Sequence, residues 1–199
     1  MTRARIAVLV SGGGRSLENL AERIRAGELD AELALVLSST ATALALERAR
    51  RLDIPALTVD PKAFATPADF SAAAWAAIED ARVDLVVLAG FLRLLLVPEA
   101  WRGRVLNIHP SLLPRFGGKG FYGERVHRAV IAAGERESGC TVHYVTNEYD
   151  KGDVLVQRRV PVLPGDDEHA LGARVFEEER IALPEAISLH LRRRSAHST

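Results

Sequence analysis

The sequence predicts an α/β fold with three layers: a mostly parallel, twisted sheet with helices on both faces and an antiparallel addition near the C-terminal part. Along the first half of the chain, short apolar runs rich in Val, Ile and Leu alternate with amphipathic stretches. Such alternation is typical of right-handed βαβ crossovers, which place strands side by side in parallel. The chain has 199 residues, 48% of them hydrophobic, enough for one buried core. We therefore expect a single domain over 1–199.

The first expected strand is 5–10, a β-branched and Leu-containing run closed by glycines, and a helix with apolar residues at helical spacing follows over 17–26. The strand–helix pattern then recurs twice, and two further strands follow. These elements are strand 33–37, helix 43–51, strand 57–59, helix 68–81, strand 85–89 and strand 105–108.

The pattern changes after residue 109, where a glycine-rich loop replaces the regular alternation. Turn-forming residues at 147–153 separate two apolar runs, which indicates an antiparallel pair. The expected elements are helix 124–133, strands 141–145 and 154–162, and a long helix from about Glu168. The end of the chain, from about 190 to 199, is expected to be a flexible tail.

The composition excludes several classes of partner. Lys plus Arg and Asp plus Glu both number 26, so the formal net charge is 26 − 26 = 0, and we expect neither nucleic acid nor a membrane surface as a partner. The longest apolar stretch, 85–97, is interrupted by Arg93 and falls short of the ~20 residues that span a bilayer. The start of the chain suits a strand better than a signal peptide. The single cysteine, Cys140, allows no internal disulfide, so we expect a cytoplasmic protein.

A glycine loop joins the first strand to the first helix, where backbone N–H groups and the positive end of the helix dipole can bind an anion. The loop residues expected to bind substrate are Gly12, Gly13, Gly14, Arg15 and Ser16. The loop lacks the Gly-Lys-Ser/Thr ending of a P-loop, and Leu17 stands where a dinucleotide fingerprint has its third glycine. We therefore expect a monophosphate rather than NAD; a tight turn without a ligand is the alternative.

Two polar side chains, Asn107 and His109, end an apolar strand. Because side chains alternate along a strand, these two project from the same side. Ligands of open α/β sheets bind beyond the carboxyl ends of the strands, where both residues fall. The alternative is structural, with Asn107 capping a turn and His109 bonded to backbone.

Two carboxylates are further candidates. Asp150 lies in the turn 147–153, where an Asp most often bonds its own turn backbone. Glu179 lies on the apolar stripe of the last helix, and a carboxylate there requires a cation or a protein partner. The histidines and Cys140 show neither C-x-x-C nor H-E-x-x-H spacing, so no metal is expected.

The run Asn107-Ile108-His109-Pro110-Ser111-Leu112-Leu113-Pro114, with Asp150-Lys151-Gly152 downstream and Ser11-Gly12-Gly13-Gly14 upstream, resembles the folate-dependent formyltransferases. Within that family the chain is similar to the branch that formylates glycinamide ribonucleotide. The resemblance extends from about residue 5 to about 190. It implies a Rossmann-like formyltransferase fold and a step of purine biosynthesis, with 10-formyltetrahydrofolate as the formyl donor.

The resemblance also implies roles for individual residues. Asn107, His109 and Asp150 match the catalytic trio, the glycine loop matches the phosphate site, and Glu179 matches the carboxylate that meets the glycinamide end of the substrate. The groove for the pterin of the folate, gripped largely by backbone, matches Phe91, Leu92, Arg93, Leu94 and Leu95. Two departures stand out: the family usually has Ser-Asn at Arg15-Ser16, and its common loop is shorter than 116–123.

For the chemistry we expect direct attack of the substrate amine on the formyl carbon, with Asn107 and His109 donating to the oxyanion and Asp150 orienting the imidazole. An amine is already a competent nucleophile, so no acyl-enzyme is needed. Two alternatives stay open. One is a related folate enzyme, either a formyltetrahydrofolate hydrolase or another formyltransferase; the other is a non-catalytic nucleotide-binding module on the same scaffold.

Overall fold

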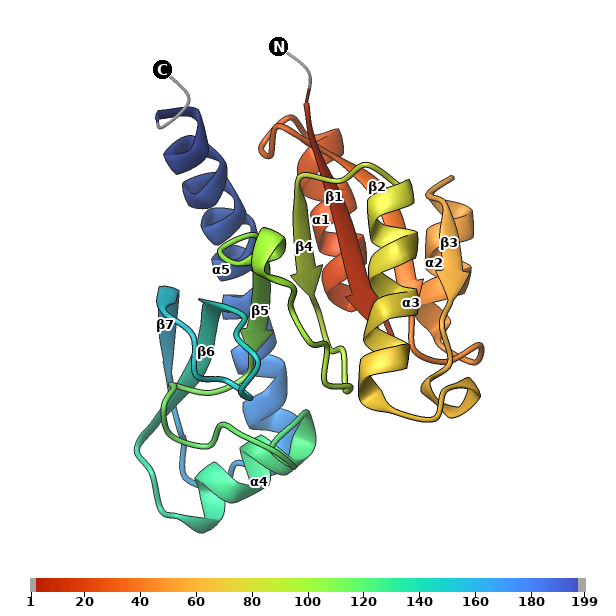
Figure 1. Ribbon diagram of the computed structural model, residues 1–199. Helices are drawn as coiled ribbons and strands as arrows, with labels where there is room; N and C mark the ends of the chain where they lie inside the picture. Colours follow the sequence, from red (N-terminus) through yellow and green to blue (C-terminus); the bar gives the residue numbers. More distant parts are fainter. Residues whose placement is uncertain (1–2, 197–199) are drawn as a thin grey trace. The chain divides into compact units, whose positions relative to one another are not determined.

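The computed structural model describes residues 3–196 and forms two compact units, divided between Leu106 and Asn107 (Figure 1). The prediction of a single domain over 1–199 stays a prediction. The predicted α/β class, mostly parallel with an antiparallel addition in the C-terminal part, is confirmed by the strand pairings.

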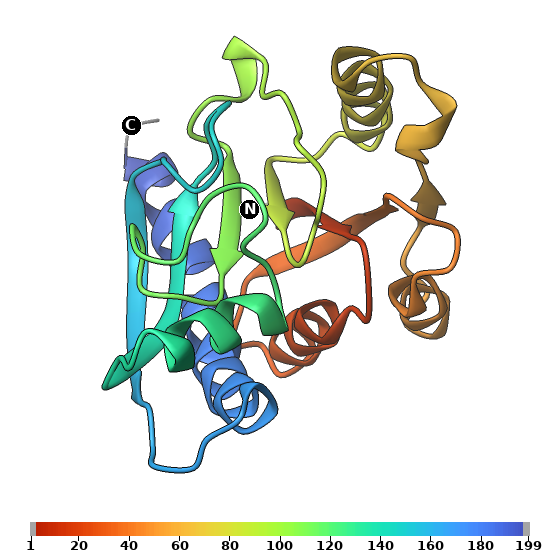
Figure 2. The ribbon, with the colours of Figure 1, turned by 90° about the horizontal axis from the view of Figure 1, so that it is seen from below.

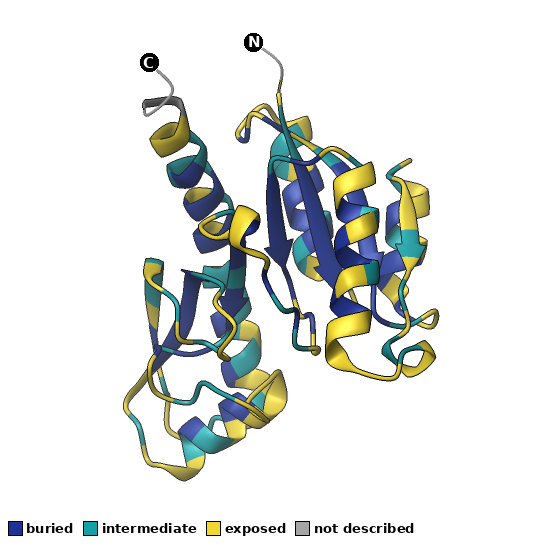
Figure 3. Cartoon of the chain, viewed as in Figure 1, coloured by how far each residue is buried: buried dark blue, intermediate teal, exposed yellow. Residues whose placement is uncertain are grey.

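Unit 1 contains a parallel sheet with the strand order β3-β2-β1-β4. Its strands are β1 (Ala4–Val10), β2 (Ala31–Ser38), β3 (Ala56–Thr58) and β4 (Leu85–Leu88). From Ile6 to Val10 every residue of β1 is fully buried, as expected for a parallel strand covered on both faces. Figure 3 shows buried strands and helices whose outer sides are exposed.

Three helices cover this sheet, and Figure 2 shows α1 and α2 on one face and α3 on the other. Their bounds are α1 Arg15–Arg25, α2 Leu44–Arg51 and α3 Pro67–Asp80. Helix α3 begins with a capping box between Thr66 and Asp69, and Pro67 occupies its first turn. Two short 3₁₀ turns, η1 (Pro61–Ala63) and η2 (Glu99–Trp101), lie in the connections. Unit 1 therefore has the three layers that the sequence predicts.

Unit 2 is built on an antiparallel pair of strands packed against a long helix. Its elements are β5 (Val105–His109), which contains the division between the units, α4 (Glu124–Ala132), β6 (Glu137–Tyr144), β7 (Val154–Pro161) and α5 (Glu168–Ala196). Strands β6 and β7 pair in antiparallel fashion, and α5 packs on both of them.

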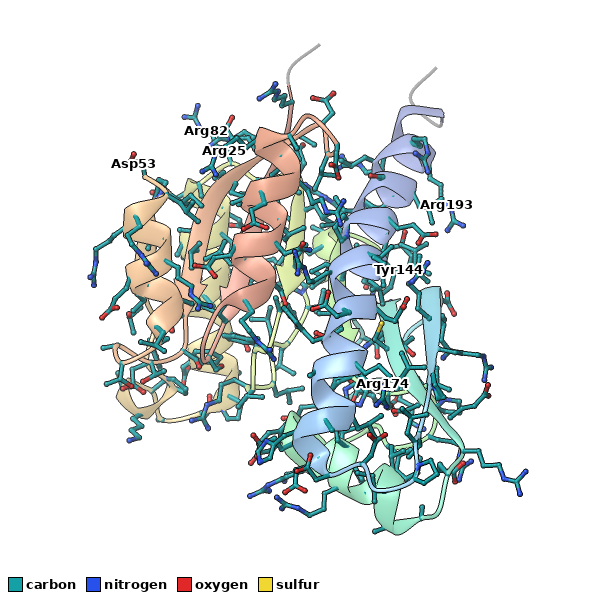
Figure 4. All side chains as sticks on the ribbon, turned by 180° about the vertical axis from the view of Figure 1, so that it is seen from behind. Arg25, Asp53, Arg82, Tyr144, Arg174 and Arg193 are labelled. Carbon is teal, nitrogen blue, oxygen red and sulfur yellow. The ribbon has the colours of Figure 1, made fainter. Side chains whose placement is uncertain are left out.

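Two boundaries differ from the sequence prediction by more than two residues. Strand β6 begins at Glu137, four residues before the expected 141, because Glu137 already pairs with Pro161 of β7. Residues 190–196, expected in a flexible tail, instead continue α5. His190 is 3% exposed, and its Nδ1 lies 3.1 Å from the hydroxyl of Tyr144, the last residue of β6. Figure 4 shows Tyr144 beside α5. Residues 197–199 lie outside the described part of the chain.

Within residues 3–196, no helix combines the length and the apolar character needed to cross a membrane.

Candidate active site

Strand β5 delivers two of the predicted site residues to one place in unit 2. The apolar side chains of Val105, Leu106 and Ile108 are buried and hold the strand in the core. Asn107 is half-buried and His109 is 4% exposed. The buried side chains of β5 therefore fix the backbone from which Asn107 and His109 project.

Asp150 reaches the same place from the turn between β6 and β7. Its backbone adopts the left-handed conformation, with φ 55°, which Asp tolerates better than most residues. Two residues later the turn returns so close to β6 that a Cβ on Gly152 would lie 1.7 Å from the Tyr144 carbonyl oxygen. Only glycine fits there, and it lets the Tyr144 N–H donate to the Asp153 carbonyl over 2.9 Å. The turn that carries Asp150 is thus tied to the end of β6.

The structure brings the three side chains of the trio together. Asn107 Nδ2 lies 3.4 Å from Asp150 Oδ1, and His109 Nδ1 lies 3.7 Å from Asp150 Oδ2. The first distance is a long hydrogen bond and the second is beyond one. The carboxylate of Asp150 therefore stands between the amide and the imidazole.

His143 also belongs to this group, and the sequence analysis did not single it out. It projects from β6 and is 1% exposed, with Nε2 3.1 Å from Asn107 Nδ2 and 3.5 Å from Asp150 Oδ1. The Nδ1 atom donates to the Tyr144 carbonyl over 2.9 Å, which leaves Nε2 to accept from Asn107. The signal available in the sequence was a polar pair, Thr141 and His143, spaced two apart on an apolar strand.

The backbone of segment 116–118 forms hydrogen bonds with two members of the trio. His109 Nε2 donates to the Phe116 carbonyl over 2.8 Å, and the Gly118 N–H donates to Asp150 Oδ2 over 2.8 Å. A carbonyl can only accept, so the proton of a neutral His109 lies on Nε2, and Nδ1 presents its lone pair toward Asp150. This loop thus sets both the His109 tautomer and the Asp150 orientation.

Thr141 anchors the chain between His109 and this loop. Its fully buried hydroxyl donates to the Ser111 carbonyl over 2.7 Å and accepts from the Leu113 N–H over 3.1 Å. The Gln157 amide donates to the same hydroxyl over 2.9 Å and to the Leu113 carbonyl over 3.1 Å. Strands β6 and β7 thereby fix the segment that follows the end of β5.

The surroundings set the protonation of the pair. Burial lowers the pKa of His109 and outweighs the opposing effects of the Asp150 charge and the Phe116 carbonyl. Burial alone would raise the pKa of Asp150, but His143, His109 and the Gly118 N–H together hold it below its ordinary value. At neutral pH the site therefore contains a carboxylate beside a neutral imidazole.

In unit 1 the glycine loop precedes α1, which begins at Arg15, two residues earlier than predicted. Gly14 is the N-cap, with φ 76° and no side-chain cap. Gly12 and Gly13 are exposed, and Arg15 and Ser16 form the first turn of the helix. The loop thus offers backbone N–H groups at an accessible helix start.

The segment 91–95 follows β4 in the same unit and is joined to the glycine loop through Ser11. The Ser11 N–H donates to the Gly90 carbonyl over 3.0 Å, and its hydroxyl accepts from the Leu92 N–H over 2.9 Å. Phe91 and Leu95 are buried, Leu92 and Arg93 are exposed, and Leu94 is intermediate. Two of the five side chains expected to form a folate groove are therefore core residues.

Glu179 lies on α5, half-buried rather than fully enclosed, between the buried Val175 and Leu183. Burial raises the pKa of the Cys140 thiol to about 12, and the negative charges of Glu179 and then Glu178 add to this effect. Cys140 is thus protonated at neutral pH and unsuited to act as a nucleophile. Among residues 3–196 no group of three or more His, Cys, Asp or Glu side chains is placed to hold a metal ion.

With this geometry in place, comparison with known proteins decides the family. The family model described as "Formyl transferase" matches residues 4–187. The chain belongs to the formyl transferase family. As the resemblance predicted, the match covers nearly the whole chain.

Individual relatives are similar over most of this family member's length. It is 44% identical, over 94% of its residues, to the trifunctional purine biosynthetic protein adenosine-3 of Drosophila pseudoobscura pseudoobscura, and spans only 14% of that protein. It is 42% identical, over 89% of its residues, to the chloroplastic phosphoribosylglycinamide formyltransferase of Vigna unguiculata, of which it spans 57%. The chain thus covers about a seventh of the first relative and little more than half of the second.

Solved structures of the family show the same fold. Glycinamide ribonucleotide transformylase 1 from Symbiobacterium toebii is 42% identical, with a TM-score of 0.87 over 94% of this chain and 86% of that one. Phosphoribosylglycinamide formyltransferase from Brucella melitensis is 37% identical, with a TM-score of 0.84 over 94% and 96% of the two chains.

Proposed function

We propose that this chain transfers the formyl group of 10-formyltetrahydrofolate to the amine of glycinamide ribonucleotide, a step of purine biosynthesis. One observation carries the proposal: in a member of the formyl transferase family, the side chains of Asn107 and His109 both lie within 3.7 Å of the Asp150 carboxylate. The activity of its named relatives, a phosphoribosylglycinamide formyltransferase and a glycinamide ribonucleotide transformylase, supports this acceptor.

The reaction exchanges one C–N bond for another. The substrate amine attacks the formyl carbon, the bond from that carbon to N10 of the folate breaks, the amine loses a proton and N10 gains one. The tetrahedral intermediate carries negative charge on the formyl oxygen, which pre-aimed donors stabilise strongly. Asn107 Nδ2 is that donor in our proposal, because its bond to Asp150 is long, at 3.4 Å, and exchanges readily for an oxyanion.

His109 carries the proton in the same proposal. Its neutral Nδ1 can accept the proton of the attacking amine, and the imidazolium then formed faces the Asp150 carboxylate at 3.7 Å. The sequence analysis expected His109 to be a second oxyanion donor, but its Nε2–H is used by the Phe116 carbonyl. A proton carrier suits this arrangement better than a second donor.

Substrate binding in this proposal uses the residues that the family resemblance indicates. The loop Gly12, Gly13 and Gly14, with Arg15 and Ser16, binds the phosphate of the ribonucleotide, supported by its exposed N–H groups. The segment 91–95 binds the pterin through its backbone. Glu179 meets the glycinamide end.

The test is an assay with 10-formyltetrahydrofolate and glycinamide ribonucleotide, followed by the change in folate absorbance. We expect turnover that requires both substrates, and for Asn107→Ala a fall in kcat of about 10²–10³, the usual cost of one oxyanion donor. Folate turnover without the ribonucleotide would instead indicate a hydrolase. Failure to bind either compound would indicate a non-catalytic module. Near-normal kcat in Asn107→Ala would remove that residue from the mechanism.

We also propose that the chain acts in the cytoplasm, on small molecules and without nucleic acid. A single cysteine, Cys140, which is buried, suits a reducing compartment. The net charge of zero provides no general attraction for polyanions.

A further inference from the structure

We propose that Arg48, on helix α2, is a positioning residue that shapes the glycine loop for the phosphate of the ribonucleotide. The inference rests on the proposed function, and it deepens it by naming a residue outside the loop on which phosphate binding depends. The sequence analysis assigned Arg48 no role.

The guanidinium of Arg48 bonds directly to the loop. Its Nη1 donates to the Gly13 carbonyl over 2.7 Å, while its Nε lies 3.1 Å from Glu18 Oε1 on α1. Its side chain is only 22% exposed, so it is held in place rather than free in solvent. Arg48 therefore connects three parts of unit 1: α2, the loop and the first turn of α1.

The start of α2 makes the neighbouring contacts. The Ala45 N–H donates to the Gly12 carbonyl over 3.1 Å. Gly14 packs so tightly on the same residue that a Cβ there would lie 2.6 Å from the Ala45 Cβ. Two successive loop carbonyls, those of Gly12 and Gly13, are thus turned toward α2.

The direction of these carbonyls fixes the direction of the loop N–H groups. In a trans peptide the C=O and the N–H point in opposite directions. The carbonyl of Gly12 shares a peptide with the N–H of Gly13, and the carbonyl of Gly13 shares one with the N–H of Gly14. Both N–H groups therefore point away from α2. Successive N–H groups that point one way form an anion-binding concavity, and Arg48 holds one of its two peptides.

Arg48 also offsets a charge that would oppose phosphate. Glu18 lies in the first turn of α1, and an unpaired carboxylate there would repel an anion bound at the loop. Arg48 pairs with it at 3.1 Å, and Arg51 reaches the same oxygen at 3.8 Å. Arg51 is 71% exposed, and among the described residues it makes no hydrogen bond to the loop. Arg51 therefore serves as the matched control.

The experiment compares Arg48→Met and Arg51→Met with the wild-type protein, under steady-state conditions, by varying each substrate in turn. For Arg48→Met we expect the KM for glycinamide ribonucleotide to rise about tenfold, as for the loss of one charge-assisted hydrogen bond. The KM for 10-formyltetrahydrofolate and kcat at saturation should stay within about twofold. Arg51→Met should match the wild type in all three quantities, within the small effect of an exposed ion pair.

A second substrate separates phosphate positioning from general damage to the fold. With glycinamide riboside, which lacks the phosphate, kcat/KM should be equal in the wild type and Arg48→Met, because the interaction that the mutation weakens is absent. Should Arg48→Met fail to fold, Arg48→Lys, which keeps the charge but loses the planar fork, should show a several-fold rise in the KM for the ribonucleotide alone.

Three outcomes would overturn the role of Arg48. They are an unchanged KM for the ribonucleotide in Arg48→Met, an equal rise in both KM values, or an equal loss with the riboside. Failure of the proposed function is a separate observation, because then the wild-type protein itself would not formylate the ribonucleotide.

Discussion

The candidate catalytic group of unit 2 and the glycine loop of unit 1 are built from different parts of the chain. In unit 2 the proposed chemistry lies in side chains: an amide and two imidazoles, each of which lies within 3.7 Å of the Asp150 carboxylate. In unit 1 the loop offers backbone N–H groups, and its shape comes from α2. A site made of side chains is sensitive to the identity of its own residues, whereas a backbone site is sensitive to the neighbours that orient it.

The largest effect expected from this comparison is in unit 2. In Asp150→Asn a neutral amide replaces the carboxylate that favours the charged form of His109, and kcat should fall by about 10²–10⁴, the usual contribution of general acid–base catalysis. The measurement is kcat with both substrates saturating. Asp153→Asn, an exposed residue of the same turn, is the control and should keep normal turnover. A loss below tenfold in Asp150→Asn would mean that the carboxylate does not assist proton transfer.

A smaller effect concerns the stability of the same side-chain group. The pKa of His109 is lowered on folding, so between that lowered value and the ordinary 6.5 the unfolded chain binds more protons and the free energy of unfolding falls as the pH falls. The lowered pKa of Asp150 acts in the same direction but only below its ordinary 3.8. Urea unfolding should therefore show that the free energy of unfolding falls less between pH 7.5 and pH 5.5 in His109→Gln than in the wild type.

The control for this measurement is His169→Gln. His169 is exposed and lies outside the candidate catalytic group, so its substitution gives the effect of removing one surface histidine, against which the change in His109→Gln is compared. If the free energy of unfolding falls equally in the wild type and in His109→Gln, folding does not lower the pKa of His109.

The smallest expected effect is in unit 1 and tests whether segment 91–95 acts through its backbone. Leu92 is 49% exposed, and Leu92→Ala leaves its N–H bond to Ser11 intact. The KM for 10-formyltetrahydrofolate should change by no more than about twofold, in line with surface substitutions. Leu95→Ala, at a residue 2% exposed, should instead lower the free energy of unfolding by about 2–5 kcal/mol. A tenfold rise in that KM for Leu92→Ala would assign pterin binding to a side chain and remove the contrast between the two regions.

The same difference explains what the sequence could predict. Asn107 and His109 followed from the period-two rule of a strand, and Asp150 was placed with them through the family resemblance. The contacts of the Phe116 carbonyl and the Gly118 N–H could not be predicted, because every residue has such groups and their direction depends on the folded loop. The role of Arg48 was missed for a related reason: it depends on a carbonyl 35 residues away.

For the fold, element types and order were predictable from apolar periodicity, whereas two boundaries depended on distant partners. The early start of β6 is set by the pairing of Glu137 with Pro161. The continuation of α5 past residue 190 is accompanied by the contact between Tyr144 and His190, 46 residues apart. Local sequence does not encode either pairing. His143 was missed although its spacing from Thr141 was visible, because a lone histidine in an apolar strand has no specific signature.

The division between Leu106 and Asn107 has a consequence for protein engineering. All four side chains of the candidate catalytic group come after this point, and both the glycine loop and segment 91–95 come before it. A gene crossover between two homologues at this position would exchange the candidate catalytic group, together with Glu179, separately from the glycine loop and segment 91–95. Chimeras joined there would show whether residues 1–106 or residues 107–199 determine the choice of acceptor, and which of the two determines turnover.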